Sequence, residues 1–166
     1  GTEKVFGVEM IDFRGLIEQS DVVSLHVPLT DETRNMVDAS VLDQMKPGAI
    51  LVNTARGAVV DTVALADALR GGRLAGAAVD VLPTEPPLID EPLIQLWREA
   101  DESNINLILT PHTAFYSVEG LQEMRTKSAQ EIVRALRGDK LLNCVNAQWL
   151  SEEVRERVLV GTPPTV

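Results

Sequence analysis

The chain is poor in cysteine, in histidine and in aromatic side chains. Cys144 is the single cysteine in 166 residues, so no disulfide can form within the chain, which favours a reducing, cytoplasmic environment. Its simplest interpretation is an inert buried thiol. Two histidines and one cysteine give no standard metal-ligand spacing, so we predict no metal site.

Positive charge and long apolar runs are also scarce. Fifteen Lys and Arg residues face 25 Asp and Glu residues, and the formal net charge is −10. This balance argues against binding to nucleic acid or to an anionic membrane, but it leaves room for a local basic pocket for an acidic ligand. The longest apolar runs are too short to span a bilayer, and the start of the chain has no signal-peptide pattern.

Four apolar segments set the expected fold class. They are nearly continuous in apolar character, as in parallel strands buried on both faces, and the spacing between them leaves room for a helix. Strands that alternate with helices predict an α/β fold with a parallel sheet and right-handed crossovers. The predicted strands are Val22–Val27, Ala49–Thr54, Ala75–Val81 and Asn106–Thr110.

Capping residues and apolar stripes predict the helices. Asp38 and Asp61 are expected N-caps, and Gly138 is an expected stop signal. The predicted helices are Phe13–Gln19, Ala39–Lys46, Thr62–Arg70, part of Leu88–Arg98, and Ser117–Arg137. Other expectations are an edge strand at Phe6–Val8, a loop at Asp101–Asn104 and a frayed tail at Gly161–Val166.

Three charged side chains follow the ends of the last three predicted strands. In an open α/β sheet, ligands bind at this edge. The fork of N–H donors on Arg56 can hold a carboxylate, and the imidazole of His112 can act as a general acid or base. Glu85 lies in a loop stiffened by prolines, where its carboxylate could orient an imidazole.

Each of these residues also has a purely structural interpretation. Arg56 could be a surface arginine paired with an acid, His112 a hydrogen-bonded histidine, and Glu85 a solvated loop acid. Asp80 lies within an apolar strand, so it needs a cofactor amide or backbone donors as partners, unless it lies near the rim of the sheet. His26 could pack beside a flat heterocycle or be a satisfied core histidine.

Four ordered phrases resemble the D-isomer-specific 2-hydroxyacid dehydrogenases. They are SDVVSLHVPLT (residues 20–30), MKPGAILVNTARGAVVD (45–61), GAAVDVLPTEP (76–86) and LTPH (109–112). The resemblance covers residues 6–146. It implies a Rossmann-type NAD-binding domain that works with NAD and a small 2-hydroxy or 2-keto acid.

The resemblance also implies roles for single residues. Arg56 would bind the substrate carboxylate and carbonyl, Glu85 would support the histidine, and His112 would be the acid/base. Asp80 would hold the nicotinamide carboxamide. The other cofactor contacts would be His26, Val27, Pro28, Thr33, Thr54 and Ala55, together with Arg56 and His112.

Two later segments resemble one branch of the family more than the others. Residues 114–117 (AFYS) and 142–146 (LNCVN) look most like the branch that contains the C-terminal-binding-protein corepressors. Phosphoglycerate dehydrogenase is a more distant relative. Phe115 stands where the corepressor branch tends to carry a tryptophan, so the substrate preference is open.

The resemblance implies three parts in the chain. Residues 1–115 would be the C-terminal part of the NAD-binding domain, 116–150 a return helix towards the substrate domain, and 151–166 a tail. There is no G-x-G-x-x-G phosphate turn, so the expected Rossmann domain is incomplete and lacks its first β-α-β unit. A fragment, a truncated product and a missing half on another chain all fit this pattern.

Three functions follow from these observations. The first is an NAD-dependent oxidoreductase acting on 2-hydroxy or 2-keto acids, with this chain inactive alone. The second is an NAD(H)-sensing, corepressor-like interaction module without metabolic turnover. The third is an inert piece. The intact set of Arg56, Glu85 and His112 favours the enzyme.

An incomplete sheet is expected to leave apolar surface uncovered, so we predict that the chain forms a homo-oligomer or binds a partner that supplies the missing half. Sedimentation velocity over a dilution series should show a species heavier than the monomer. A stable monomer at high dilution would contradict this expectation.

Overall fold

The computed structural model describes residues 5–103 and 105–160. The chain divides into two compact units, Gly1–Ala114 and Phe115–Val166. The first unit contains a parallel sheet with its helices, and the second contains a long helix and a short C-terminal segment. The predicted tail at Gly161–Val166 lies outside the described residues.

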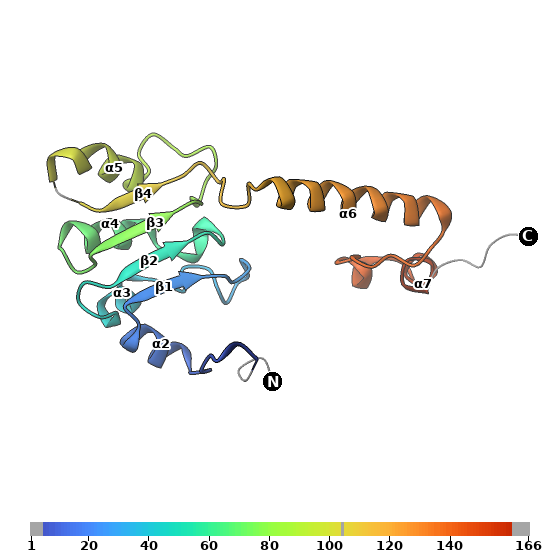
Figure 1. The fold of residues 1–166 in the computed structure, drawn as a ribbon, viewed down its shortest axis with the longest axis horizontal. Coiled ribbons are helices and arrows are strands. Elements are labelled where there is room, and N and C mark those ends of the chain that lie inside the picture. Colours follow the sequence, from blue (N-terminus) through green and yellow to red (C-terminus); the bar gives the residue numbers. More distant parts are fainter. Residues whose placement is uncertain (1–4, 104, 161–166) are drawn as a thin grey trace, which may run out of the picture. The chain divides into compact units, whose positions relative to one another are not determined.

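A four-stranded parallel sheet forms the centre of the first unit. Its strands are β1 (Val22–Leu25), β2 (Ile50–Asn53), β3 (Gly76–Val79) and β4 (Leu107–Leu109). Each strand pairs with the next one along the chain, so the spatial order equals the chain order (Figure 1). The predicted α/β class, the parallel sheet and the positions of all four strands are confirmed.

The helices of this unit are α2 (Phe13–Gln19), α3 (Ala39–Gln44), α4 (Thr62–Arg70) and α5 (Pro92–Ser103), with the 3-10 turn η1 (Gly57–Val59) after β2. A right-handed crossover between neighbouring parallel strands puts its helix on one defined face. The helices α3, α4 and α5 lie in the connections β1–β2, β2–β3 and β3–β4, and each connection moves one strand further in the same direction across the sheet. With right-handed crossovers, all three helices therefore belong on the same face.

Short polar side chains begin the helices where the sequence predicts. The Asp38 carboxylate accepts the Val41 N–H (3.0 Å) at the start of α3. The Asp61 carboxylate accepts the N–H groups of Val63 and Ala64 (3.0 and 3.1 Å) at the start of α4. These bonds satisfy donors that the first helical turn leaves unpaired.

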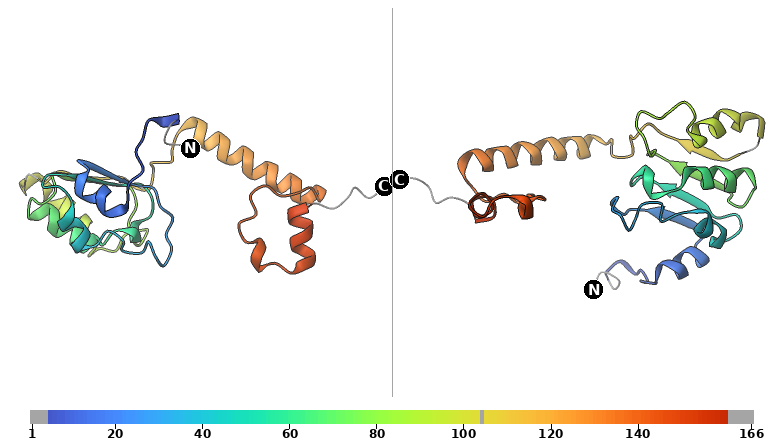
Figure 2. Two further views of the ribbon diagram at one scale, coloured as in Figure 1. Left: turned by 90° about the horizontal axis from the view of Figure 1, so that it is seen from below. Right: turned by 180° about the vertical axis from the view of Figure 1, so that it is seen from behind.

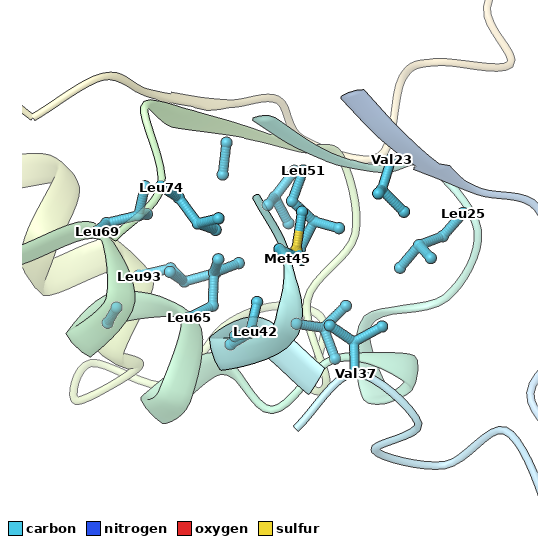
Figure 3. Packing of buried hydrophobic residues seen from close by; sticks show 14 of the residues in the cluster. Val23, Leu25, Val37, Leu42, Met45, Leu51, Leu65, Leu69, Leu74 and Leu93 are labelled. Carbon is cyan, nitrogen blue, oxygen red and sulfur yellow. The ribbon is translucent and has the colours of Figure 1, made fainter. Parts of the chain in front are cut away.

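The core lies between the sheet and these helices. In Figure 3, side chains from α3 and α4 point towards those of the sheet. Leu42 and Leu65 on the helices and Leu51 on β2 are almost fully buried. The opposite face of the sheet is less covered, since Val22 and Ile108 are 56% and 58% exposed. Burial of the strands on both faces is therefore not observed among the described residues.

Two local predictions are wrong. Phe6–Val8 is not an edge strand, because residues 5 and 6 are helical and Gly7 has a φ of +65°, in the left-handed region that ends the turn. Residues 101–103 are not a loop but continue α5. Arg98, Glu99 and Ala100 are strong helix formers, and polarity without a glycine or proline does not end a helix. Asn104 lies outside the described residues.

The second unit begins with α6 (Val118–Arg137), a single long helix (Figure 2). Ser117 caps its start, and Gly138, with a φ of +73°, ends it, as predicted. The 3-10 turn η2 (Ala147–Trp149) and α7 (Glu152–Val160) follow. The Leu141 N–H donates to the Val158 carbonyl (2.8 Å), which ties α7 back to the segment after α6.

The buried stripe of α4 provides a test of the core. Replacing Leu65 with Ala removes a side chain with no exposed surface and should lower the free energy of unfolding by about 2–5 kcal/mol. Replacing Val63 with Ala on the same helix, where the side chain is 57% exposed, should change it by less than about 0.5 kcal/mol. Urea unfolding measures both, and equal losses would contradict this assignment of the core.

Candidate functional site at the carboxyl edge of the sheet

The strand register brings the candidate residues to one edge. Leu25 pairs with Asn53, Asn53 with Val79, and Val79 with Leu109. These pairs form a row across the four strands at their carboxyl ends. The next residue of each strand therefore belongs to the following row, which consists of His26, Thr54, Asp80 and Thr110. Because parallel strands all end at the same edge, residues from four distant segments meet there.

A histidine–carboxylate pair lies at this edge. His112 Nδ1 and Glu85 Oε2 are 2.7 Å apart. The other oxygen of the Glu85 carboxylate accepts the Leu82 N–H (3.0 Å), which fixes the carboxylate in its loop. Both side chains remain partly exposed, at 45% for His112 and 36% for Glu85. An imidazole oriented by a carboxylate and still accessible to a ligand is the arrangement of a general acid/base.

The hydrogen bonds of Glu85 shift its titration. Burial raises the pKa of Glu85, but the hydrogen bonds from His112 and from the Leu82 N–H outweigh burial, and the net pKa is lowered. The carboxylate is therefore ionised at neutral pH. The ionised carboxylate is the hydrogen-bond partner of His112 Nδ1 and orients the ring.

The backbone at His112 is in the left-handed region, with a φ of +53°. Few residues other than glycine adopt this conformation, and the surrounding structure must hold it in place. The His112 N–H donates to the Asp80 carbonyl (2.9 Å) and to the Thr110 carbonyl (3.0 Å). The end of β3 therefore fixes the main chain that carries the imidazole.

Asp80 also holds the segment around His112 with its side chain. The carboxylate is buried at 5% exposure and accepts the Thr110 hydroxyl, the Thr113 N–H (2.8 Å) and the Ala114 N–H (2.9 Å). Burial raises the pKa of Asp80, but these bonds outweigh burial and the net pKa is lowered. The expectation that this buried carboxylate needs partners is met by a hydroxyl and two backbone N–H groups.

Arg56 lies just beyond the end of β2. Its guanidinium donates to the Ala55 carbonyl (2.6 Å) and is exposed. None of its other N–H groups has a hydrogen-bond partner among the described residues, so they can take an anionic ligand. Among the hydrogen bonds of residues 5–103 and 105–160, none joins Arg56 to His112 or to Glu85.

Close packing fixes the loop after Arg56 against the loop that carries Glu85. A Cβ at Gly57 would lie 2.0 Å from the carbonyl carbon of Leu82 and 2.4 Å from the Pro83 nitrogen. Only glycine allows this approach of two main chains. The segments that carry Arg56 and Glu85 thus share a contact that any side chain would break.

The predicted cofactor contacts on β1 lie at the same edge. His26 follows β1 and is exposed, and its Nε2 is 2.8 Å from the Ser24 hydroxyl, so it is not a core histidine. The Thr33 hydroxyl donates to the Pro28 carbonyl (2.6 Å) and closes the loop after β1. Among the other predicted cofactor contacts, Val27 is half-buried, Thr54 is exposed and Ala55 is buried.

A pocket of about 400 Å³ adjoins the histidine–glutamate pair. Its walls are mostly apolar and come from α5 and from the ends of β3 and β4. They include Ile94, Trp97, Leu109 and Pro86, with His112 and Glu85 at the polar side. The His112 imidazole therefore borders a mostly apolar surface with few protein hydrogen-bonding groups.

Sequence reasoning missed two residues of this edge. Asn53 is buried at 1% exposure and binds the segment around Arg56, and Thr110 binds the carboxylate of Asp80. The signal for Asn53 was a polar amide at the end of an apolar strand. Nothing local marks Thr110, because its partner lies 30 residues away.

Comparison with known proteins decides the family. The model of the family described as "D-isomer specific 2-hydroxyacid dehydrogenase, NAD binding domain" matches residues 1–114, more than half of the chain. This chain belongs to that family. The match ends at the boundary between the two structural units, so the first unit is an NAD-binding domain of the 2-hydroxyacid dehydrogenases.

Three similar proteins illustrate the relationship. A glyoxylate reductase of Korarchaeum cryptofilum is 44% identical over 88% of this chain and 42% of its own length. The NAD-complexed D-isomer specific 2-hydroxyacid dehydrogenase of Lactobacillus delbrueckii ssp. bulgaricus has a TM-score of 0.70 at 34% identity, over 82% of this chain and 43% of its own. The D-lactate dehydrogenase of Aquifex aeolicus complexed with NAD and lactic acid has a TM-score of 0.67 at 34% identity. That match covers 76% of this chain and 40% of the dehydrogenase.

The chain spans less than half the length of these relatives. The cofactor of the family domain is NAD, and the residues present fit one part of it. An ionised carboxylate offers about four acceptor positions, and three donors occupy Asp80 among the described residues. By this count, one acceptor position has no protein donor among the described residues.

The described residues carry neither a cluster of metal ligands nor a membrane-spanning helix. In segments 5–103 and 105–160, no three His, Cys, Asp or Glu side chains gather in a way that could hold a metal ion. No helix within these segments has the length and apolar character needed to cross a bilayer.

The bonds to Asp80 predict a pH-dependent loss of stability. Replacing Asp80 with Asn puts an N–H₂ group against backbone N–H donors and should lower the free energy of unfolding at pH 7 by about 1.5–3 kcal/mol. The pKa of Asp80 is lowered by folding, so its contribution is present above its unfolded pKa of about 4 and is lost as pH falls through the folded pKa.

Urea unfolding at pH 7 and at pH 3 measures this difference. The gap between the original protein and the Asp80→Asn variant should narrow at the lower pH. Asp31→Asn, at an exposed position, is the control and should change little at either pH. A gap that is equal at both pH values would argue against the ionised carboxylate as its source.

Proposed function

We propose that this chain forms the cofactor-binding half of an NAD-dependent 2-hydroxyacid dehydrogenase. The reaction in the reductive direction converts a small 2-keto acid to the 2-hydroxy acid. The observation that carries the proposal is the His112–Glu85 pair, 2.7 Å apart at the carboxyl edge of an NAD-binding domain of this family. This pair is what acid/base chemistry at a carbonyl requires.

The relatives favour a small substrate. One is named a glyoxylate reductase, and one of the solved structures holds lactic acid with NAD. Glyoxylate and pyruvate are therefore the first keto acids to test. Both carry a carboxylate next to the carbonyl, which suits one guanidinium.

The proposed mechanism assigns one task to each side chain. When bound, NADH supplies the hydride that adds to the keto carbon. Protonated His112 donates a proton to the carbonyl oxygen, which becomes the hydroxyl of the product. Arg56 holds the carboxylate and polarises the carbonyl through its fork of donors. Glu85 orients the imidazole through the contact with Nδ1.

The cofactor contacts complete the proposal. Asp80 would accept an N–H of the nicotinamide carboxamide at its remaining acceptor position. The residues after β1 and β2 would hold the rest of the cofactor. The contacts there would be His26, Val27, Pro28, Thr33, Thr54 and Ala55.

Three expectations remain proposals about the larger organisation. Residues 1–115 would serve the cofactor, 116–150 would lead towards a substrate domain, and 151–166 would be a tail. The chain would act as an oligomer or with a partner. Its nearer relationship to the corepressor branch is likewise a proposal that rests on residues 114–117 and 142–146.

The carboxylate that orients the proposed proton donor can be tested on its own. The pKa of Glu85 is lowered, so its carboxylate stays ionised from neutral pH down through the ordinary range of a glutamate. Replacing Glu85 with Gln keeps the shape of the side chain but removes the ionised carboxylate that lies 2.7 Å from His112 Nδ1, so kcat for keto-acid reduction should fall. Steady-state rates with glyoxylate and NADH at pH 7, in the protein that contains this half and a substrate-binding half, measure the loss, and an unchanged kcat would contradict a role of Glu85 in orienting the proton donor.

Removal of the imidazole tests the assignment directly. In the protein that contains this half and a substrate-binding half, His112→Ala should lower kcat at least about 100-fold, the low end of general acid–base contributions. Lys140→Ala, at an exposed position in the second unit, is the control and should keep the full rate. Equal rates in the two variants would refute the role of His112.

A further inference from the structure

A buried amide lies beneath the segment that carries Arg56. Asn53, the last residue of β2, is 1% exposed. Its side-chain oxygen accepts the Ala55 N–H (3.0 Å), and its side-chain N–H₂ donates to the Arg56 carbonyl (3.0 Å). One side chain thus binds the peptide groups on both sides of the Ala55–Arg56 bond.

These two bonds replace secondary structure where there is none. Thr54, Ala55 and Arg56 lie between the end of β2 and the start of η1, so neither a strand nor a helix ladder fixes their main chain. Ala55 is itself buried, which leaves little water to take over the bond to its N–H. The Asn53 amide therefore determines the local conformation.

The same residue joins this segment to the neighbouring strand end. The Asn53 carbonyl accepts the Asp80 N–H (2.9 Å). Two residues after Asp80, the Leu82 main chain packs on Gly57 and its N–H donates to Glu85. The main chain at Arg56 is thus held on one side by the Asn53 amide and on the other by the contact of Gly57 with the loop of Glu85.

We propose that Asn53 is a positioning residue for Arg56. Its amide does not reach the ligand, because it is buried under the loop, but it sets the direction in which the guanidinium leaves the main chain. This inference rests on the proposed role of Arg56 as the carboxylate clamp. Without the amide, the guanidinium would be spread over more orientations, and the substrate carboxylate would bind less often in the reactive one.

The two bonds explain why the position needs an amide. The Ala55 N–H requires an acceptor, and the Arg56 carbonyl requires a donor. An aspartate has nearly the same shape and keeps the acceptor, but it places a second oxygen against the Arg56 carbonyl. An alanine keeps neither group.

Kinetics of the protein that contains both this half and a substrate-binding half test the positioning role. With glyoxylate as the probe and NADH saturating, Asn53→Ala and Asn53→Asp should each raise the KM for glyoxylate at least about tenfold, with a smaller fall in kcat. The pH profile of the rate should keep its shape, because the His112–Glu85 pair is untouched. Hydrogen exchange at the Ala55 N–H should become faster in Asn53→Ala.

Two further variants separate the possible causes. Leu65→Ala removes a core side chain in α4, away from this edge, and controls for general loss of stability. It should leave the KM for glyoxylate unchanged at temperatures where it is folded. Arg56→Ala tests the clamp itself and should raise the KM at least as much as the Asn53 variants.

The outcomes are distinct. A raised KM in Arg56→Ala and in both Asn53 variants, but not in Leu65→Ala, would support the inference. A raised KM in Arg56→Ala with less than a twofold change in a folded Asn53 variant would refute the positioning role alone. An unchanged KM in Arg56→Ala would refute the clamp, and the inference with it. If Asn53→Ala does not fold, the nearly isosteric Asn53→Asp gives the same decision.

Discussion

A buried carboxylate without water must be satisfied by protein groups, and at the carboxyl edge of this sheet that constraint falls on Asp80. Its oxygens accept a hydroxyl from the end of β4 and two N–H groups from the segment that follows, while its main-chain carbonyl accepts the N–H of His112. These bonds hold a left-handed residue in place. An ionised group that would be costly to bury alone thus becomes the anchor for the proposed acid/base.

Arg56 and Glu85 are held by two different loops, and the main chains of these loops meet at Gly57. Arg56 is carried by the turn after β2, which the Asn53 amide holds from below. Glu85 is carried by the loop after β3, which it fixes itself through the Leu82 N–H. Gly57 lets the two main chains meet. The spacing between the groups that would bind and protonate a keto acid is therefore set by main-chain packing, which varies less than side-chain rotamers.

Local signals made much of this fold predictable. Asp38, Asp61 and Gly138 act on the turns beside them, and sequence alone located the helix ends that they cap. The roles assigned to Arg56, Glu85 and His112 came from their strand-end positions and a family resemblance, and the structure adds a contact of 2.7 Å between the last two. The partnership of Thr110 with Asp80 could not be predicted, because the register of β3 and β4 creates it. The exposure of Val22 and Ile108 could not be predicted either. An apolar strand residue can be buried, but the sequence of the strand does not show whether another element covers that face of the sheet.

The agreement between spatial order and chain order has a consequence for how the domain acquires its shape. Every strand adds to the edge left by the strand before it, so pairing needs only moderate loop closures and can proceed from β1 to β4. The bonds to Asp80 and the contact between Glu85 and His112 all need β4 or the residues after it. A nascent sheet of three strands would already carry the turn with Arg56, yet it would lack the strand that brings His112, the proposed acid/base, to Glu85. The proposed site would therefore be complete only after the last strand has paired.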